Sequence, residues 1–509
     1  MYDERIQEGR VPTVVEIHRT GVYVRPDSSR VLFRPHGIGP EDRVSRVVSR
    51  LLYLPETEAS RIAQRIALEF DGRHDRLRAY LLRRFEQVEP HLPTDQALSD
   101  SRKVLIGAAF TQEYALEAAA LFNPSIVPHP DQSDLPDGAL RFVLSLRAVG
   151  EGHISSIVFR EGIIGADGSI EIPPPAEYST AGESIPGPHY EKELFLKKLE
   201  ELGLLSTRVG TVMGRLEETF TLAELESTIS RELRRDRSVS SAERQLFEGV
   251  LALARSNYEL EFPPSRRLSE RVIYPNSPTE RYGIEDARFV AFTDDDGSVT
   301  YYAPYTAYSG ELILPQILET TDFQRFRIST LNGPMVENKG LALFPRRFDG
   351  RYAMLARQDN ENIHLMYSEM LHFWYTRRRI LRPTFWWEAV QIGNCGSPIE
   401  TDAGWLVITH GVGPMRKYSL GAVLLEKDDP SVVLGRLPQP LMAPMEHERE
   451  GYVPNVLYSC GALVHAGKLV LPYAMSDQSS SFALISLDEL IDDLLRWGPT
   501  GGKHERQGG

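Results

Sequence analysis

The sequence predicts a mainly β protein of the β-propeller type, and three observations lead to that prediction. From residue 269 to residue 487 the chain reads as many short apolar runs, separated at close intervals by turn residues such as those at 294–297 and 402–404. Strands this short and this numerous are typical of closed all-β architectures, which leave few sheet edges exposed. A recurring unit, in most copies a Gly-containing turn, an apolar strand and a polar or aromatic residue at the strand end, favours a propeller over a sandwich. The unit occurs at 299–308, 350–357, 404–411 and 468–474.

The first quarter of the chain has a different texture. Residues 11–35 alternate apolar and polar types and predict one or two short strands. Over residues 40–89 the apolar residues recur with a helical period, which predicts two or three amphipathic helices. Further helices are expected over about 94–107 and over 113–121.

Two more segments complete the predicted organisation. Residues 122–174 return to short β-like runs separated by Gly and Asp turns, whereas residues 189–258 are rich in Glu, Leu, Lys and Arg and contain no Pro. The second segment therefore reads as a helical insertion between strands. We expect a strand and helical region at 1–98 and a propeller domain at 99–509 that this insertion interrupts.

Composition limits the classes of function. The 509 residues are 41% hydrophobic and 25% charged, which is ordinary for a globular protein and enough for a large core. The net charge is −14 and the basic residues are scattered, so we expect a small-molecule partner and no nucleic acid.

Metal, membrane and targeting signals are weak. Cys395 and Cys460 lie in no zinc-ligand spacing, so we expect no metal and two reduced buried thiols. No apolar run approaches the roughly 18 residues that span a bilayer, and the N-terminus lacks an apolar core segment. The expectation is a cytoplasmic protein without a membrane partner.

The stretch 282–288, Tyr-Gly-Ile-Glu-Asp-Ala-Arg, is where we expect the chemistry. Gly283 allows a sharp turn, and two adjacent carboxylates precede the guanidinium of Arg288. On a strand, neighbouring side chains point to opposite faces, so Asp286 can face a pocket while Glu285 pairs with Arg288 or its surroundings. Asp286 is then free to act as an acid. The same pattern also fits an ordinary surface salt bridge.

Strand ends elsewhere supply more groups of the same kind. One carboxylic acid, several fixed cations and aromatic rings describe a site for a sugar and an anion. Because buried cations without an anion repel one another, a phosphate-like ligand is expected if these residues converge. The groups are Asp286, Arg288, Lys339, Arg357, His410 and Asp477, with Tyr305, Tyr308, Tyr418 and Tyr473 among them.

Several ordered motifs resemble those of glycoside hydrolase family 130. The resemblance covers about 270–490, with a first blade at 122–174, and leaves out the N-terminal helices and the segment 189–258. It implies a five-bladed β-propeller that is a β-mannoside phosphorylase or, in some members, a β-mannosidase. The motifs are Gly-Ile-Glu-Asp-Ala-Arg at 283–288, Tyr-Thr-Ala-Tyr-Ser-Gly at 305–310, Asn-Lys-Gly-Leu-Ala-Leu-Phe-Pro at 338–345, the run 396–412 with Thr-His-Gly-Val, the run 421–430 and Pro-Tyr-Ala-Met-Ser-Asp at 472–477.

The resemblance also implies roles for individual residues. Asp286 matches the catalytic acid, which in the phosphorylases protonates the leaving oxygen through the mannose 3-hydroxyl. The implied phosphate-binding residues are Lys339, Arg357, His410 and Tyr418, and the implied substrate-binding residues are Asn123, Arg288, Tyr305 and Asp477.

Two departures from the family pattern stand out. Ala287 replaces a Pro of the acid motif, which is structurally mild. Gln391 stands where phosphorylases usually carry a phosphate-contacting Lys. One such contact is worth about 1.5–3 kcal/mol, so its loss weakens the phosphate site without abolishing it.

Phosphorolysis is the preferred hypothesis, with a β-mannoside oligosaccharide as substrate, inorganic phosphate as co-substrate and no cofactor. An inverting β-mannosidase is the first alternative; it needs a second carboxylate about 6.5–9.5 Å from the acid, for which Glu400 and Glu450 are candidates. A non-catalytic carbohydrate-binding propeller is the second alternative. The sequence leaves open the linkage, whether the chain forms a homo-oligomer, and the purpose of residues 1–98 and 189–258.

Overall fold

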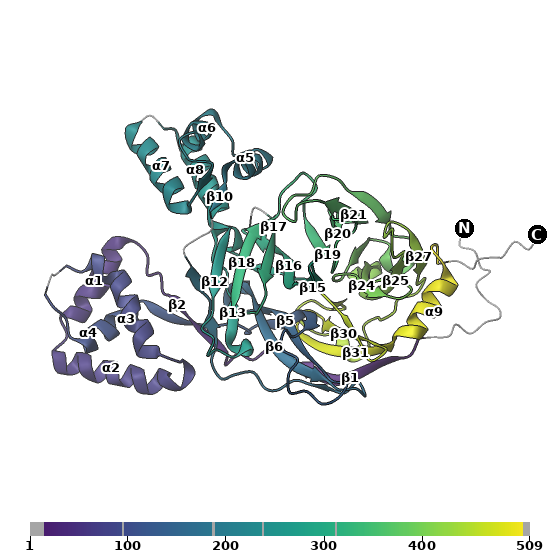
Figure 1. Ribbon diagram of the computed structural model, residues 1–509. Helices are drawn as coiled ribbons and strands as arrows, with labels where there is room; N and C mark the ends of the chain where they lie inside the picture. Colours follow the sequence, from purple (N-terminus) through teal and green to yellow (C-terminus); the bar gives the residue numbers. More distant parts are fainter. Residues whose placement is uncertain (1–14, 94–95, 186–188, 237–238, 311–312, 502–509) are drawn as a thin grey trace, which may run out of the picture.

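The protein is mainly β, with two groups of helices that project from one side of a β body (Figure 1). The computed structural model describes residues 15–93, 96–185, 189–236, 239–310 and 313–501. Within these ranges the chain forms five sheets of four or more strands, numbered here in the order in which the chain builds them. The first sheet contains β4 (Ala120–Pro128), β5 (Leu140–Val149), β6 (Ser155–Ile164), β7 (Ile170–Glu171), β8 (Thr180–Ala181) and β13 (Arg271–Ile273).

The remaining sheets follow along the chain, and most neighbouring strands within them pair antiparallel as short hairpins. The second holds β9 (Glu183–Ile185), β12 (Tyr258–Glu261), β14 (Ile284–Glu285), β15 (Val290–Thr293), β16 (Val299–Tyr308), β17 (Ile313–Thr320) and β18 (Arg325–Thr330). The third holds β19 (Lys339–Leu343), β20 (Tyr352–Arg357), β21 (Ile363–Ser368) and β22 (Arg378–Leu381). The fourth holds β23 (Gln391–Asn394), β24 (Ile399–Thr401), β25 (Gly404–Val412), β26 (Tyr418–Leu425) and β27 (Val433–Arg436). The fifth holds β28 (Leu457–Tyr458), β29 (Leu463–His465), β30 (Lys468–Met475), β31 (Ser479–Ser486) and β1 (Ile17–Val24).

Buried apolar clusters join each sheet to the next. Phe159 of the first sheet stacks on Phe326 of the second, with ring centroids 5.8 Å apart. Similar clusters connect the second sheet to the third, the third to the fourth and the fourth to the fifth. Phe142 and Phe482, with centroids 6.1 Å apart, then connect the first sheet to the fifth. The series of sheets therefore returns to its starting point, and burial of each large side chain contributes about 1.5–3 kcal/mol.

Strands from both ends of the chain share the fifth sheet. β1 pairs antiparallel with β31, placing Ile17 opposite Ile485. The alternation over residues 11–35 predicted this strand but could not show its partner. The pairing also crosses the expected boundary at residue 98, because β1 lies in a sheet of the β body.

The N-terminal helices form a small unit with its own apolar core, which includes Val48, Phe85 and Ile106. The expected helix over 113–121 is wrong, because this stretch forms the end of β3 (Thr111–Ala115) and the start of β4. The residues of β3 pair with β2 (Val31–Pro35) instead of forming a helical turn. α4 extends this unit past residue 98. Its elements are β2 (Val31–Pro35), α1 (Glu41–Leu52), α2 (Glu56–Phe70), α3 (Leu77–Val88), α4 (Asp100–Ala109) and β3 (Thr111–Ala115).

The helical insertion predicted at 189–258 is present and also has its own core. Capping boxes at Thr221 and Ser240 begin α7 and α8, since each hydroxyl and the Glu three residues later satisfy free N–H groups of the first turn. Across the described ranges, no helix is both long and apolar enough to cross a bilayer. The elements are β10 (Tyr190–Glu191), α5 (Lys192–Glu201), α6 (Thr207–Met213), β11 (Thr219–Phe220), α7 (Leu222–Arg235) and α8 (Ser241–Arg255), and α9 (Leu487–Trp497) follows the fifth sheet.

Candidate active site

The segment 283–288 enters the site through a short strand and leaves it by a left-handed turn. Gly283 has φ 126° and lies against Ser155 of the first sheet, where a Cβ would collide with the Ser155 hydroxyl. That hydroxyl donates to the Ile284 carbonyl at 2.9 Å. Asp286 has φ 54°, so the strand alternation stops at Glu285. The expectation that Glu285 and Asp286 face opposite sides is therefore wrong.

Both carboxylates instead face Arg147 of β5. Arg147 Nη2 donates to Glu285 Oε1 at 2.9 Å, and Nη1 lies 3.5 Å from Asp286 Oδ1. The guanidinium also lies over the ring of Phe122, 5.2 Å from its centroid. Sequence reasoning missed Arg147, although a charged residue inside the apolar run Arg-Phe-Val-Leu-Ser-Leu-Arg-Ala-Val was a usable signal.

Asp286 is largely buried and surrounded by donors. Asn123 Nδ2 donates to Asp286 Oδ1 at 2.6 Å, which places Asn123 beside the acid, and its contact with substrate stays a prediction. Burial alone would raise the pKa of Asp286, but the charges of Arg147, Arg288 and Lys339 outweigh it and hold the pKa below its ordinary value. The Asp286 carboxyl is therefore ionised at neutral pH in the unliganded protein.

Glu285 was expected to pair with Arg288 or its surroundings, and it pairs with Lys339 and Arg147. Arg288 is buried, and its guanidinium donates to the Cys395 carbonyl at 2.8 Å, the Tyr458 hydroxyl at 2.7 Å and the Asp286 carbonyl at 3.1 Å. Through its bond to the Asp286 carbonyl, Arg288 stabilises the backbone of the turn. The predicted direct contact of Arg288 with substrate finds no support in this geometry, because its side chain is 2% exposed.

Arg357, His410, Gln391 and Tyr418 form a second group, which we call the cation side of the site; Glu285, Asp286, Arg147, Lys339 and Asn123 form the carboxylate side. Arg357 Nη1 lies 3.4 Å from His410 Nε2. The His410 ring stacks on Tyr418, with centroids 5.9 Å apart. The two sides adjoin, because Lys339 is the register partner of Arg357 in the β19–β20 pair.

The charges of the cation side are not balanced. Burial, together with the charges of Arg357 and Arg288, holds the pKa of His410 well below its ordinary value, so this ring is neutral. With the amide of Gln391 oriented so that Nε2 donates to the Asn360 carbonyl at 3.2 Å, its Oε1 accepts from Arg357 Nη1. In the part of the chain that the structure describes, the Arg357 guanidinium forms no ion pair and its buried Nε has no hydrogen-bond partner. A half-buried guanidinium in this state is a binding group for an anion.

Asp477 joins the carboxylate side from the turn that follows β30. Its burial and the nearby charge of Asp286 raise its pKa to about 6, against the opposing charges of Arg147 and Arg416. Asn123, Asp286 and Asp477 all have left-handed backbones, with φ of 50°, 54° and 51°. Asn and Asp tolerate this conformation better than other side chains, and such strained residues gather at functional sites.

Other candidates lie elsewhere. Tyr305 is buried within the second sheet, where its hydroxyl donates to Glu280 at 2.7 Å, so the predicted substrate contact is wrong. Glu400 is tied to Arg346 at 3.1 Å, and Glu450 is exposed, so neither is a general base beside Asp286. The Tyr473 hydroxyl donates to Glu448 at 2.8 Å. The sequence could not separate these residues from those of the site, because strand alternation alone does not say which face of a sheet meets its neighbour.

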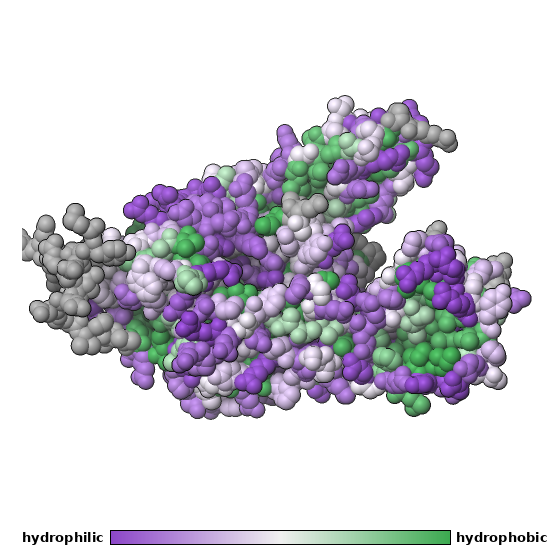
Figure 2. All heavy atoms as spheres, turned by 180° about the vertical axis from the view of Figure 1, so that it is seen from behind, coloured by the Kyte–Doolittle hydropathy of each residue, from purple (hydrophilic) through white to green (hydrophobic). Residues whose placement is uncertain are grey.

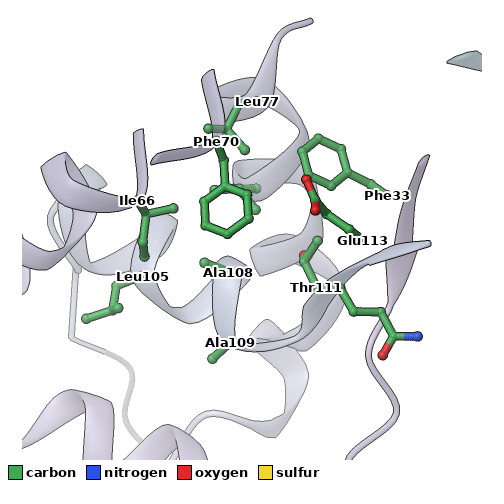
Figure 3. A pocket seen from close by; sticks show the side chains of 11 residues that line it. Phe33, Ile66, Phe70, Leu77, Leu105, Ala108, Ala109, Thr111 and Glu113 are labelled. Carbon is green, nitrogen blue, oxygen red and sulfur yellow. The ribbon is translucent and has the colours of Figure 1, made fainter. Parts of the chain in front are cut away.

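A separate cavity of about 400 Å³ lies among the N-terminal helices (Figure 3). Its lining is largely apolar and includes Phe33, Ile66, Phe70 and Leu77. Apolar surface is visible over these helices in Figure 2. The carboxylate of Glu113 at its edge is already bound by Arg73 at 2.9 Å. This cavity therefore lacks the acid and the free cation that the site on the β body has.

Comparison with known proteins gives matches over the second half of the chain. A family profile described as beta-1,4-mannooligosaccharide phosphorylase matches residues 254–496. A 1,2-beta-oligomannan phosphorylase from Thermoanaerobacter sp. (strain X514) is 33% identical over 232 residues, which cover 44% of this chain and 75% of that protein. A beta-1,4-mannooligosaccharide phosphorylase from Ruminococcus albus is 29% identical over 242 residues, which cover 45% of this chain and 70% of that protein.

Among solved structures, that of a beta-1,2-mannobiose phosphorylase from Listeria innocua in complex with beta-1,2-mannobiose has a TM-score of 0.44. Its sequence is 21% identical, and the alignment covers 75% of this chain and 93% of that one. The matched residues 254–496 include Asp286, Lys339, Arg357, His410 and Asp477. They leave out Asn123, Arg147 and the N-terminal helices, whose place is known from the structure alone.

Proposed function

Because the chain belongs to glycoside hydrolase family 130, we propose that it is a β-mannoside phosphorylase. In this proposal it transfers a β-mannosyl residue from an oligosaccharide to inorganic phosphate and releases mannose 1-phosphate with inversion. In this proposal the five sheets are the five blades of a propeller. The site lies where strands of several blades meet, because its residues come from sheets built by distant parts of the chain. Relatives that are 29–33% identical to it are named as phosphorylases of 1,2- and 1,4-linked β-mannosides.

One observation carries the proposal: a half-buried guanidinium without a carboxylate partner adjoins a largely buried carboxyl of the same site. Arg357 has no carboxylate partner among the described residues, and His410 beside it is neutral. A phosphate supplies the missing negative charge and can accept hydrogen bonds from both side chains. Tyr418, stacked on His410, lies within reach of the same anion.

The reaction follows from these positions. Phosphate held by Arg357, His410 and Lys339 attacks C1 of the mannosyl residue on the face opposite the leaving group, and the C1–O bond to the leaving sugar breaks. Asp286 supplies the proton of the leaving hydroxyl through the mannose 3-hydroxyl. The bound phosphate, which attacks as its monohydrogen form, returns a proton to Asp286 when the sugar phosphate becomes a dianion. No second carboxylate is needed as a base, because phosphate is itself the nucleophile.

The lowered pKa of Asp286 has a place in this mechanism. An ionised carboxyl is a poor acid, and Arg147, Arg288 and Lys339 keep it ionised in the unliganded protein. A phosphate dianion bound by Lys339 offsets part of that positive field and raises the pKa of Asp286. Phosphate binding therefore prepares the acid as well as the nucleophile.

Inverting hydrolysis is the second candidate, and Gln391 in place of a cation favours it. Asp477, whose pKa is raised to about 6, is then the carboxylate that activates water. The two functions are separated by incubating the protein with 1,2- and 1,4-linked β-mannobiose, with and without phosphate. Phosphorolysis gives mannose 1-phosphate only when phosphate is present. Equal release of mannose in both conditions, with no sugar phosphate, would overturn the proposal.

A further inference from the structure

Another cavity, of about 220 Å³ and with a more polar lining, lies between the helical insertion and the β body. In Figure 1 the insertion stands above β17 and β18, and α5 is its helix nearest to this junction. The insertion contributes Tyr190, Phe195 and Lys198 to the lining. Arg327 of β18 and His372 line the opposite side. The volume is below the ~300–1,000 Å³ of cavities for drug-sized ligands, so it suits a ligand of about one sugar ring.

The polar groups of this cavity include both donors and acceptors. Arg327 forms no ion pair among the residues that the structure describes, whereas Arg325 on the same strand is bound to Glu259 at 2.6 Å. Glu191, an exposed carboxylate, also lines the cavity. Arg327 lies in register with Glu319 of β17 and interacts with its charge, and Lys198 is paired with Glu201, so the lining has no net preference for a charged ligand. These groups suit a neutral molecule whose hydroxyls both accept and donate hydrogen bonds.

His372 adds a neutral ring to the lining. Its Nδ1 is buried and has no hydrogen-bond partner within the described part of the chain. Burial and the charge of Arg327 lower the pKa of His372 to about 4, so the ring is neutral. Because Nδ1 has almost no exposed surface, a ligand in the cavity reaches the half-buried ring through its other atoms.

Aromatic rings complete the lining. Phe373 and Phe195 are both buried side chains of the cavity wall, and Phe195 packs edge-on against Tyr190 with centroids 5.6 Å apart. Apolar rings beside convergent polar groups match the two faces of a pyranose, which has C–H groups on its faces and hydroxyls around its edge. We propose that this cavity between the insertion and the β body binds one neutral hexose unit.

Contacts beside the cavity connect it to the site. Lys198 Nζ donates to the Leu331 carbonyl at 3.0 Å, and Gly333 N donates to Glu201 at 3.0 Å. Between them, Asn332 N donates to the His372 carbonyl at 2.8 Å. The segment fixed in this way runs directly into Lys339 at the start of β19. These contacts form without a hexose, so a bound hexose would act on Lys339 by shifting this segment, and this part of the inference rests on the proposed function.

The test is calorimetric titration of the full-length protein with mannose, with β-mannobiose and with mannose 1-phosphate. For each sugar the number of bound molecules and each affinity are measured. We expect the wild type to bind mannose at a site that Arg327→Ala and His372→Ala each weaken by about 10-fold or more, as loss of a charged or buried hydrogen bond predicts. Arg325→Ala, on the same strand but paired with Glu259, is the matched control and leaves the affinity unchanged. Arg327 is exposed, so its variant keeps the fold.

The two proposals fail separately. Asp477→Ala weakens sugar binding at the candidate active site and leaves the cavity site intact. Sugar binding that Asp477→Ala abolishes and that Arg327→Ala and His372→Ala leave at wild-type strength overturns the cavity proposal. Tighter binding of mannose 1-phosphate than of mannose, lost in Arg327→Ala, overturns the neutral class of ligand. Cavity binding without any turnover of mannosides overturns the proposed function alone.

Discussion

The carboxylate side and the cation side of the site differ in how their charges are balanced. On the carboxylate side, Arg147 and Lys339 are both bound to Glu285, and Asp286 has Asn123 and Arg147 as partners. On the cation side, the hydrogen-bonding neighbours of the Arg357 guanidinium within the described ranges are a neutral imidazole and an amide, and neither carries a negative charge. A half-buried charge with no opposite charge beside it is less favourable than a paired one. The first side is therefore complete without a ligand, whereas the second is complete only when an anion binds.

The largest expected effect comes from breaking the carboxylate side at its acid. We expect Asp286→Asn to lower kcat for phosphorolysis of β-mannobiose by about 10²–10⁴-fold, the usual contribution of a general acid. The amide keeps the hydrogen-bonding shape, so KM changes little. Release of mannose 1-phosphate is the measurement, and Asp402→Asn at an exposed turn is the control. Turnover at the wild-type rate in Asp286→Asn would remove Asp286 from the mechanism.

The second carboxylate of this side gives a pH dependence with a definite sign. The pKa of Asp477 rises from 3.8 to about 6 on folding, so between about pH 4 and pH 6 the folded state binds more protons than the unfolded state. Stability from this group is present below the unfolded pKa and is lost as the pH rises through 6. The full effect is about 3 kcal/mol of unfolding free energy.

Denaturant unfolding of the wild type and of Asp477→Asn, compared from pH 4 to pH 7, measures this contribution. The difference in unfolding free energy between the two proteins should change by about 3 kcal/mol across that range. A constant difference would mean that Asp477 titrates in the folded protein as it does in water.

On the cation side, Arg357→Ala should act on phosphate and not on the sugar. Loss of a charge-assisted hydrogen bond of about 1.5–3 kcal/mol predicts a rise of about 10–100-fold in the KM for phosphate. The KM for mannobiose stays close to that of the wild type. Initial rates over a phosphate series give both values, with Arg346→Ala, which is bound to Glu400 at the surface, as the control. An unchanged phosphate KM would show that the unpaired guanidinium is not the anion site.

Sequence reasoning identified the mainly β architecture, the helical insertion and the adjoining positions of Asp286, Lys339, Arg357 and His410. Its predictions were wrong or incomplete where the backbone departed from the strand alternation, and where contacts between distant parts of the sequence determined the structure. Asp286 turns left-handed, which brings Glu285 to the same side, and strand alternation cannot anticipate that turn. Arg147 lies 138 residues from Glu285 in the sequence, and β1 finds β31 at the far end of the chain. Such contacts depend on the order of the sheets, which local patterns do not encode.

The smallest effect, Gln391→Lys, tests the comparison from the other direction by adding a charge to the unbalanced side. A Lys beside Arg357 lacks a carboxylate there, so without phosphate the two cations repel and the melting temperature falls. With phosphate the added cation is paired, and the KM for phosphate should fall by about 10-fold. Thermal unfolding with and without phosphate measures the first effect, and Gln391→Met is the neutral control. The stabilisation by phosphate should then be larger in Gln391→Lys than in the wild type, because the ligand binds the folded state more tightly. Equal stabilisation by phosphate in the two proteins would mean that position 391 lies outside the anion site. The difference in charge balance between the carboxylate side and the cation side would then depend on Arg357 and His410 alone.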